Sequence, residues 1–178
     1  MRDIVQDGEA VLREEAKLVP EALFGTPELA KLIADMTKTL DREPEGVALA
    51  APQIGISWRL FIVRKDRTLP PITIPEGAPP PPPLPAEIEV FINPEIMKTS
   101  RKRAKADEGC LSVRGVYGTT KRHERVSIRA RRADGSRFTR GAGGLMAQIF
   151  EHEIDHLNGI LFIDHAEHLI HIKHVATA

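Results

Sequence analysis

Two histidines four residues apart, with a glutamate directly after the first, are the residues of this 178-residue chain best suited to chemistry. They are His152, Glu153 and His156, in the stretch EHEIDHLNG (residues 151–159). Each residue of an α-helix advances by about 100° around the axis, so the two imidazoles share one face with the carboxylate beside them. This spacing predicts a metal held by two imidazoles, next to a carboxylate that can move a proton.

A catalytic metal site of this kind needs a third protein ligand. Two known patterns place the third ligand downstream of His156, and neither supplies one here. Phe162 stands where one pattern needs a histidine, and Glu167 lies too near His156 for the pattern that uses a later glutamate. Cys110, the one cysteine, is the remaining soft ligand, and its alternative role is that of a buried apolar filler. The later histidines are three residues apart, so they drift around a helix and cannot all face one metal. They are His165, His168, His171 and His174. We expect them in a mostly solvated tail, and a second or adventitious metal site is the alternative.

The segments around these residues predict an α+β domain, with helices and short strands out of βαβ order. Residues 26–43 (TPELAKLIADMTKTLDRE) predict an amphipathic helix, with Thr26 as N-cap and Pro27 at the first helical position. A second helix is predicted from about Gly144 to the stop signal Asn158-Gly159. Strands are predicted over three further segments. They are residues 58–64, residues 87–94 and a hairpin over residues 124–138.

Two compositionally biased segments have plain structural interpretations. Residues 69–86 are rich in proline, which cannot join a helix or a sheet ladder, so we expect an exposed insertion within one domain spanning residues 1–178. A proline ligand for a partner protein is the alternative. Residues 121–140 are rich in arginine and lysine, and a solvated strand face explains them more simply than an RNA-binding patch.

Composition excludes several functional classes. The 25 basic and 25 acidic side chains cancel, so no global charge favours nucleic acid or a membrane surface. A single cysteine allows no internal disulfide. The sequence has no run of 18 apolar residues and no apolar stretch near its start that would indicate a secretory signal. We therefore expect a cytoplasmic protein without membrane attachment.

Three motifs, taken in order, resemble the signature motifs of the peptide deformylases. They are GVALAAPQIG (46–55), EGCLS (108–112) and HEIDH (152–156). The resemblance runs from the helix at residue 26 to about residue 165, and it implies an α+β fold with antiparallel strands packed around the metal-binding helix. The implied reaction is hydrolysis of the N-formyl group from the formyl-methionine end of newly made polypeptides, with release of formate. A paralogue with weak activity, or with another formyl amide as substrate, is the alternative.

The resemblance also implies a role for each matching residue. Cys110, His152 and His156 would hold one divalent metal ion, generally Fe2+, although Zn2+, Ni2+ or Co2+ can occupy the same site. Glu153 would be the general base and then the general acid. Gln53 and the Leu111 N–H would stabilise the oxyanion. The implied substrate-binding residues are Gly46, Val47, Ala48 and Ile149. The implied partner is the nascent formyl-Met peptide, with a transient ribosome contact and no direct recognition of nucleic acid.

Three positions depart from the family's usual pattern. Ala48 stands where the family has glycine, Glu151 where it has glutamine, and Arg114 where it has proline. We expect the Ala48 methyl group to fill part of the substrate cleft, and the alternative is that it points into the core. All three departures bear on substrate affinity and specificity more than on hydrolysis itself.

Overall fold

The computed structural model describes residues 2–70, 76, 77, 79, 82 and 84–172 of the chain. Its larger sheet has five antiparallel strands in the order β1-β2-β3-β6-β7. The strands are β1 (Ala48–Ala50), β2 (Leu60–Arg64), β3 (Ile88–Thr99), β6 (Arg125–Arg131) and β7 (Arg137–Gly143). Because β1 is at the end of this order, one of its edges has no neighbouring strand among the described residues.

The larger sheet is covered on both faces by helices. Successive side chains of a strand point to opposite faces, so Leu60 and Ile62 of β2 pack in one apolar cluster while Phe61 and Val63 pack in the other. The first cluster includes the buried side of α1 (Pro27–Asp41), and the second includes α2 (Gly144–Leu157). All five residues of β2 are therefore buried, and fully burying each large apolar side chain contributes about 1.5–3 kcal/mol.

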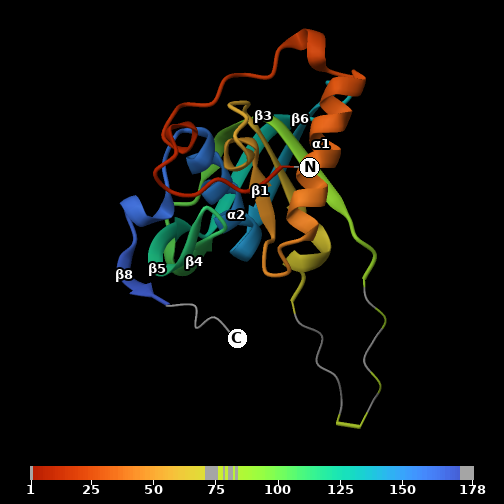
Figure 1. Cartoon of the computed structure of the whole chain (residues 1–178). Coiled ribbons are helices and arrows are strands. Elements are labelled where there is room, and N and C mark those ends of the chain that lie inside the picture. Colours follow the sequence, from red (N-terminus) through yellow and green to blue (C-terminus); the bar gives the residue numbers. More distant parts are fainter. Residues whose placement is uncertain (1, 71–75, 78, 80–81, 83, 173–178) are drawn as a thin grey trace, which may run out of the picture.

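A smaller antiparallel sheet lies on the other side of α2. Its order is β4-β5-β8, and its strands are β4 (Arg103–Cys110), β5 (Val113–His123) and β8 (Glu167–His171). Figure 1 shows α2 between this sheet and the larger one, with α1 on the outer side of the larger sheet. The predicted α+β fold, with antiparallel strands packed around the helix that carries the two histidines, is confirmed.

The helix signals in the sequence correspond to the helices of the structure. The Thr26 hydroxyl accepts the N–H of Leu29 at the start of α1, and α2 begins at Gly144. At the end of α2 the chain turns at Gly159, whose φ of 72° suits glycine, and an added Cβ would lie 2.5 Å from the Arg13 carbonyl oxygen. Short 3₁₀ helices complete the elements. They are η1 (Ala10–Leu12), η2 (Glu21–Leu23), η3 (Ala51–Ile54), η4 (Lys65–Thr68) and η5 (Phe162–Asp164).

Strands β1, β4 and β5 lie outside the predicted strand segments, and β3 and β8 differ from the sequence-based expectation. The strand predicted over 87–94 continues to Thr99, because its second half pairs with β6. Part of the predicted histidine-rich tail is β8, which pairs with β5, although every residue of β8 is exposed to solvent as expected. His174 lies outside the described residues.

The proline-rich connection joins η4 to β3. Its described residues are exposed and extend away from the two sheets (Figure 1). The connection's base is held by an ion pair between Lys65 and Glu87, with 2.8 Å between Nζ and Oε1, and by a backbone hydrogen bond between the same residues. Within the part of the chain that the structure describes, no helix combines the length and apolar character needed to cross a bilayer.

Candidate functional site

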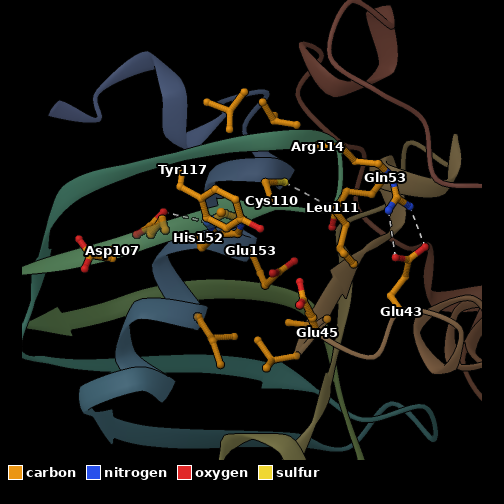
Figure 2. A pocket seen from close by; sticks show the side chains of 18 of the residues that line it. Glu43, Glu45, Gln53, Asp107, Cys110, Leu111, Arg114, Tyr117, His152 and Glu153 are labelled. Atoms are coloured by element: carbon orange, nitrogen blue, oxygen red, sulfur yellow. Dashed lines mark hydrogen bonds and ion pairs between the residues drawn. The ribbon is translucent and has the colours of Figure 1, made fainter. Parts of the chain in front are cut away.

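Cys110, His152 and His156 come together although they belong to two different elements. The cysteine ends β4, and the histidines project from α2 one turn apart. The candidate ligand atoms of the three residues all lie within 4.8 Å of one another, and the Cys110 Sγ is 3.2 Å from Nε2 of His156. Figure 2 shows Cys110 beside His152 at the centre of a cleft. One thiolate and two imidazoles at these separations form a donor set suited to a transition metal.

His152 is oriented by a buried carboxylate. Its Nδ1–H donates to Oε2 of Glu108 at 2.9 Å, which leaves Nε2 free to face Cys110. Arg122 holds Glu108 through two hydrogen bonds of 2.6 and 3.0 Å, and it also donates to Asp155 at 2.7 Å. Burial opposes ionisation of Glu108, but the hydrogen bonds from His152 and Arg122 outweigh it and keep the carboxyl's pKa well below its usual range.

Two buried polar atoms beside the cluster have no hydrogen-bond partner among the described residues. They are Oε2 of Glu153 and Nδ1 of His156. Buried polar atoms are nearly always paired, so unpaired atoms at this place indicate that the protein groups alone do not complete the site. The donor set of one thiolate and two imidazoles fits a bound metal ion held by Cys110, His152 and His156, and Nε2 is the ring nitrogen of His156 that faces the cysteine sulfur. Burial also raises the pKa of Glu153 to about 7, a range in which a carboxyl group can both accept and release a proton.

Gln53 points its amide group at the cluster. Its Oε1 accepts the N–H of Ala50 at 2.8 Å, and this fixes the direction of the amide nitrogen. Nε2 of Gln53 lies 3.5 Å from the Cys110 sulfur and 3.3 Å from Oγ of Ser112. Leu111 lines the same cleft, and its carbonyl is held by the Gln6 side chain at 3.0 Å. The structure therefore brings both predicted oxyanion-stabilising residues to the edge of the metal cluster.

The cluster lies in a cleft of about 580 Å³, the size of a small-ligand or peptide site. All four predicted substrate-binding residues line it. They are Gly46, Val47, Ala48 and Ile149. The Val47 carbonyl accepts the N–H of Arg64, so it points toward β2. Because backbone groups alternate in direction along an antiparallel strand, those of Ala48 point toward the free edge of β1.

The Ala48 side chain is nevertheless mostly a core residue. Its residue exposure is 7%, and it packs in the α2-side cluster with Phe61 and Val63. It is paired with Val63 in the β1–β2 ladder and does not have a positive φ, so the position makes no special demand for glycine. The structure thus favours the core interpretation over a methyl group that fills the cleft.

The two charged departures from the family pattern each have a partner. Arg114 donates to both carboxylate oxygens of Glu43, at 2.7 and 3.2 Å. Glu151 is buried and accepts the N–H of His123 at 2.8 Å and its Nδ1–H at 2.6 Å. Both charges are therefore paired with a residue of another element. Arg114 of β5 pairs with Glu43 after α1, and Glu151 of α2 pairs with His123 of β5.

Sequence reasoning missed Glu108, Arg122 and Asp155. One signal could have found Glu108, because a metal-binding histidine usually donates its second N–H to a carboxylate and Glu108 is two residues before the predicted cysteine ligand. No local sequence pattern predicts the role of Arg122, because its contacts with Glu108 and Asp155 depend on how β5 packs against α2.

Comparisons with known proteins agree with this geometry. The family model described as polypeptide deformylase matches residues 1–171. The peptide deformylase of Carboxydothermus hydrogenoformans is 39% identical over 167 residues, 94% of each chain. Two crystal structures of class I type b peptide deformylase from Acinetobacter baumannii are also similar. The actinonin-bound one has a TM-score of 0.78 and 32% identity, covering 94% of this chain and 99% of that one. The Met-Ala-Ser-bound one has a TM-score of 0.76 and 33% identity, covering 92% and 98%.

Proposed function

This chain belongs to the peptide deformylase family, and on that premise we propose which of its residues carry out the reaction. The chain is a metal-dependent hydrolase that removes the N-formyl group from formyl-methionine at the start of new polypeptides. The family matches do not favour the alternative of a paralogue with another substrate. The observation that carries the proposed roles is the convergence of Cys110, His152 and His156 beside the unpaired carboxylate oxygen of Glu153.

We propose that the metal is Fe2+ in the cell, held by Cys110, His152 and His156. A thiolate with two imidazoles supports this choice, and the same donor set accepts Zn2+, Ni2+ or Co2+. When bound, the metal would supply a Lewis acid that polarises the formyl group and makes water a stronger acid.

Glu153 is the proposed proton carrier. It accepts a proton from the attacking water as the water oxygen bonds to the formyl carbon. It then delivers this proton to the departing amine nitrogen as the carbon–nitrogen bond breaks, so formate and a free amine result. Support comes from its burial beside the proposed ligands and from its Oε2, for which the described residues offer no hydrogen-bond partner.

Gln53 and the backbone N–H of Leu111 are the proposed donors to the oxygen on which negative charge develops. The Gln53 amide is fixed before substrate arrives, because its oxygen already accepts the Ala50 N–H. A donor held in place in this way stabilises charge without reorganising, and losing one costs roughly 3 kcal/mol of transition-state stabilisation.

The substrate backbone is proposed to lie along the free edge of β1, as an added strand beside Gly46, Val47 and Ala48. The direction of the Ala48 backbone groups supports this placement. Ile149, on α2 at the side of the cleft, supplies an apolar surface for the methionine side chain. A related enzyme from Acinetobacter baumannii has been solved with Met-Ala-Ser bound, which is consistent with a peptide cleft.

We propose that the protein works in the cytoplasm on nascent formyl-Met chains, with a brief ribosome contact and without binding nucleic acid directly or entering a membrane. The known class of substrate and the balanced charge of the chain support this setting.

The ligand assignment and the activity are tested together. Anaerobic loading with Fe2+, followed by formate release from several formyl peptides, should give turnover with formyl-Met peptides and one metal per chain. Cys110→Ala should lose most of the metal and the activity. Full metal occupancy and turnover in Cys110→Ala would reject the ligand assignment, whereas an Fe2+-loaded parent without formate release would reject the activity itself.

A further inference from the structure

Residues 42–46, in the loop between α1 and β1, form part of the cleft wall and are called the cleft loop. The loop leads directly into the free edge of β1. Four of its residues line the cleft, and they are Glu43, Pro44, Glu45 and Gly46. The position of this loop therefore affects where a peptide along β1 can lie.

Arg67 holds the cleft loop from outside the cleft. Its Nη1 is 3.2, 2.7 and 2.6 Å from the carbonyl oxygens of Leu40, Glu43 and Gly46. These carbonyls belong to the last turn of α1 and to the cleft loop, and two of them also accept a backbone N–H, Leu40 from Glu43 at 3.1 Å and Glu43 from Gly46 at 2.9 Å. A guanidinium suits this place because the C-terminal end of a helix carries partial negative charge. Arg67 belongs to η4, at the base of the proline-rich connection.

Arg114 holds the same loop from across the cleft. It lies four residues after Cys110, and its two guanidinium nitrogens face the two oxygens of Glu43 (Figure 2). A two-pronged pair of this kind fixes direction as well as distance. The Arg114 and Glu43 side chains are 49% and 21% exposed, so the pair contributes little to overall stability. Its effect is to link the segment that carries the cysteine ligand to the opposite wall of the cleft.

We propose that Arg67 and Arg114 are positioning residues that clamp the cleft loop for binding of the peptide beyond the formyl-methionine. This inference rests on the proposed docking of the substrate along β1. Neither arginine contacts Cys110, His152, His156 or Glu153 in the described structure, so the clamp acts on substrate binding and leaves bond cleavage to the metal cluster. Arg114 gives this chain a cross-cleft contact at a position where the family pattern has proline.

The test compares formyl-methionine amide with formyl-Met-Ala-Ser, using the metal-loaded full chain and the variants Arg67→Met and Arg114→Gln. For the tripeptide, each variant should raise KM roughly fivefold and keep kcat within about twofold of the parent value. This is the result expected when a mutation removes an interaction that is equally strong in the ground state and the transition state. The short substrate should be affected by less than about twofold, because it does not reach the cleft loop. Arg129→Gln is the matched control, since Arg129 forms a comparable ion pair with Glu95 on β3, at 2.7 Å and away from the cleft.

Two further measurements separate positioning from general damage. Amide hydrogen exchange at residues 42–48 should be faster in Arg67→Met and Arg114→Gln than in the parent, with metal content unchanged. Reversing the pair, with Glu43→Arg and Arg114→Glu together, should restore the tripeptide KM that either single reversal raises.

Three results would overturn the proposal. One is unchanged exchange at residues 42–48 together with an unchanged tripeptide KM. The second is an equal loss with both substrates accompanied by loss of metal, which would mark a structural role. The third is a parent enzyme with the same KM for both substrates, which would reject docking along β1 itself and with it the positioning role. The third result is measured on the parent enzyme, whereas the first two are measured on the arginine variants. A failure of the docking proposal can therefore be distinguished from a failure of the proposed positioning role.

Discussion

Glu153 is a residue that packing alone does not explain. It is 4% exposed, and one of its oxygens has no hydrogen-bond partner among the described residues. An unsatisfied buried polar group costs roughly 1–3 kcal/mol. Its position beside the predicted ligands, and a pKa raised by burial to about 7, are what a proton carrier requires.

Replacing Glu153 should separate metal binding from turnover. We expect Glu153→Ala and Glu153→Gln to keep the metal and to lose roughly a hundredfold or more in kcat, because a positioned acid–base group contributes about 10²–10⁴. Metal analysis and formate release should be measured on the same samples. Activity within threefold of the parent in either variant would remove Glu153 from the mechanism.

Arg122 has a different importance, because it is the counter-charge of two carboxylates near the ligands. Its side chain is 7% exposed and that of Glu108 is 1% exposed. We expect Arg122→Met to lower the free energy of unfolding by about 3 kcal/mol, since it removes the guanidinium paired with the buried Glu108 and leaves that carboxylate only its hydrogen bonds from His152 and Thr120. Denaturant unfolding of the metal-free proteins would measure this. Arg129→Gln, in an exposed pair, should change stability by less than about 1 kcal/mol. A similarly small change in Arg122→Met would show that Glu108 does not depend on it.

Among the elements, those with strong local signals could be predicted from the sequence. Thr26 and Pro27 mark the start of α1, and the Asp134-Gly135 turn joins β6 to β7. Elements that depend on distant partners could not be predicted. The strand β1 has only three residues and exists because β2 lies beside it, and β8 is an exposed strand that only its pairing with β5 defines.

The structure of β1 changes the expected result of one substitution. Because the Ala48 methyl group is packed in the core, Ala48→Gly should remove packing and loosen the strand, at a cost of about 0.5–1 kcal/mol. We expect kcat/KM on formyl-Met peptides to be unchanged or lower, measured together with the denaturation midpoint. Ala130→Gly, at a buried strand position of the same cluster and away from the cleft, is the control. A several-fold rise in kcat/KM for Ala48→Gly alone would support the cleft interpretation instead.

For the molecule as a whole, the sequence identifies the site more completely than the contacts that support it. The proposed ligands, the proposed base and Gln53 lie in motifs that can be recognised locally. Glu108, Arg67 and Arg122 owe their roles to contacts between β4, β5, η4 and the two helices, and no spacing in the sequence reveals which arginine meets which carbonyl or carboxylate.

The proline-rich connection should be dispensable for chemistry. Replacing residues 70–85 with a short Gly/Ser link keeps Arg67 and the Lys65–Glu87 pair at its base, so we expect kcat/KM within about twofold of the parent. The measurement is formate release, with circular dichroism to verify folding. Loss of turnover in a folded protein would mean that the connection contributes to the cleft.

The placement of α2 also has a consequence for how the protein itself is made. Chains emerge from the ribosome with the N-terminus first, and His156 follows Cys110 by 46 residues. Until α2 emerges, the α2-facing side of the larger sheet lacks its cover, and β3 lacks its β6 neighbour until that strand appears. The complete ligand set therefore cannot exist until α2 has emerged. Binding of the metal by all three ligands must follow the docking of α2 between the two sheets, and until then Cys110 is a thiol without its two imidazole neighbours.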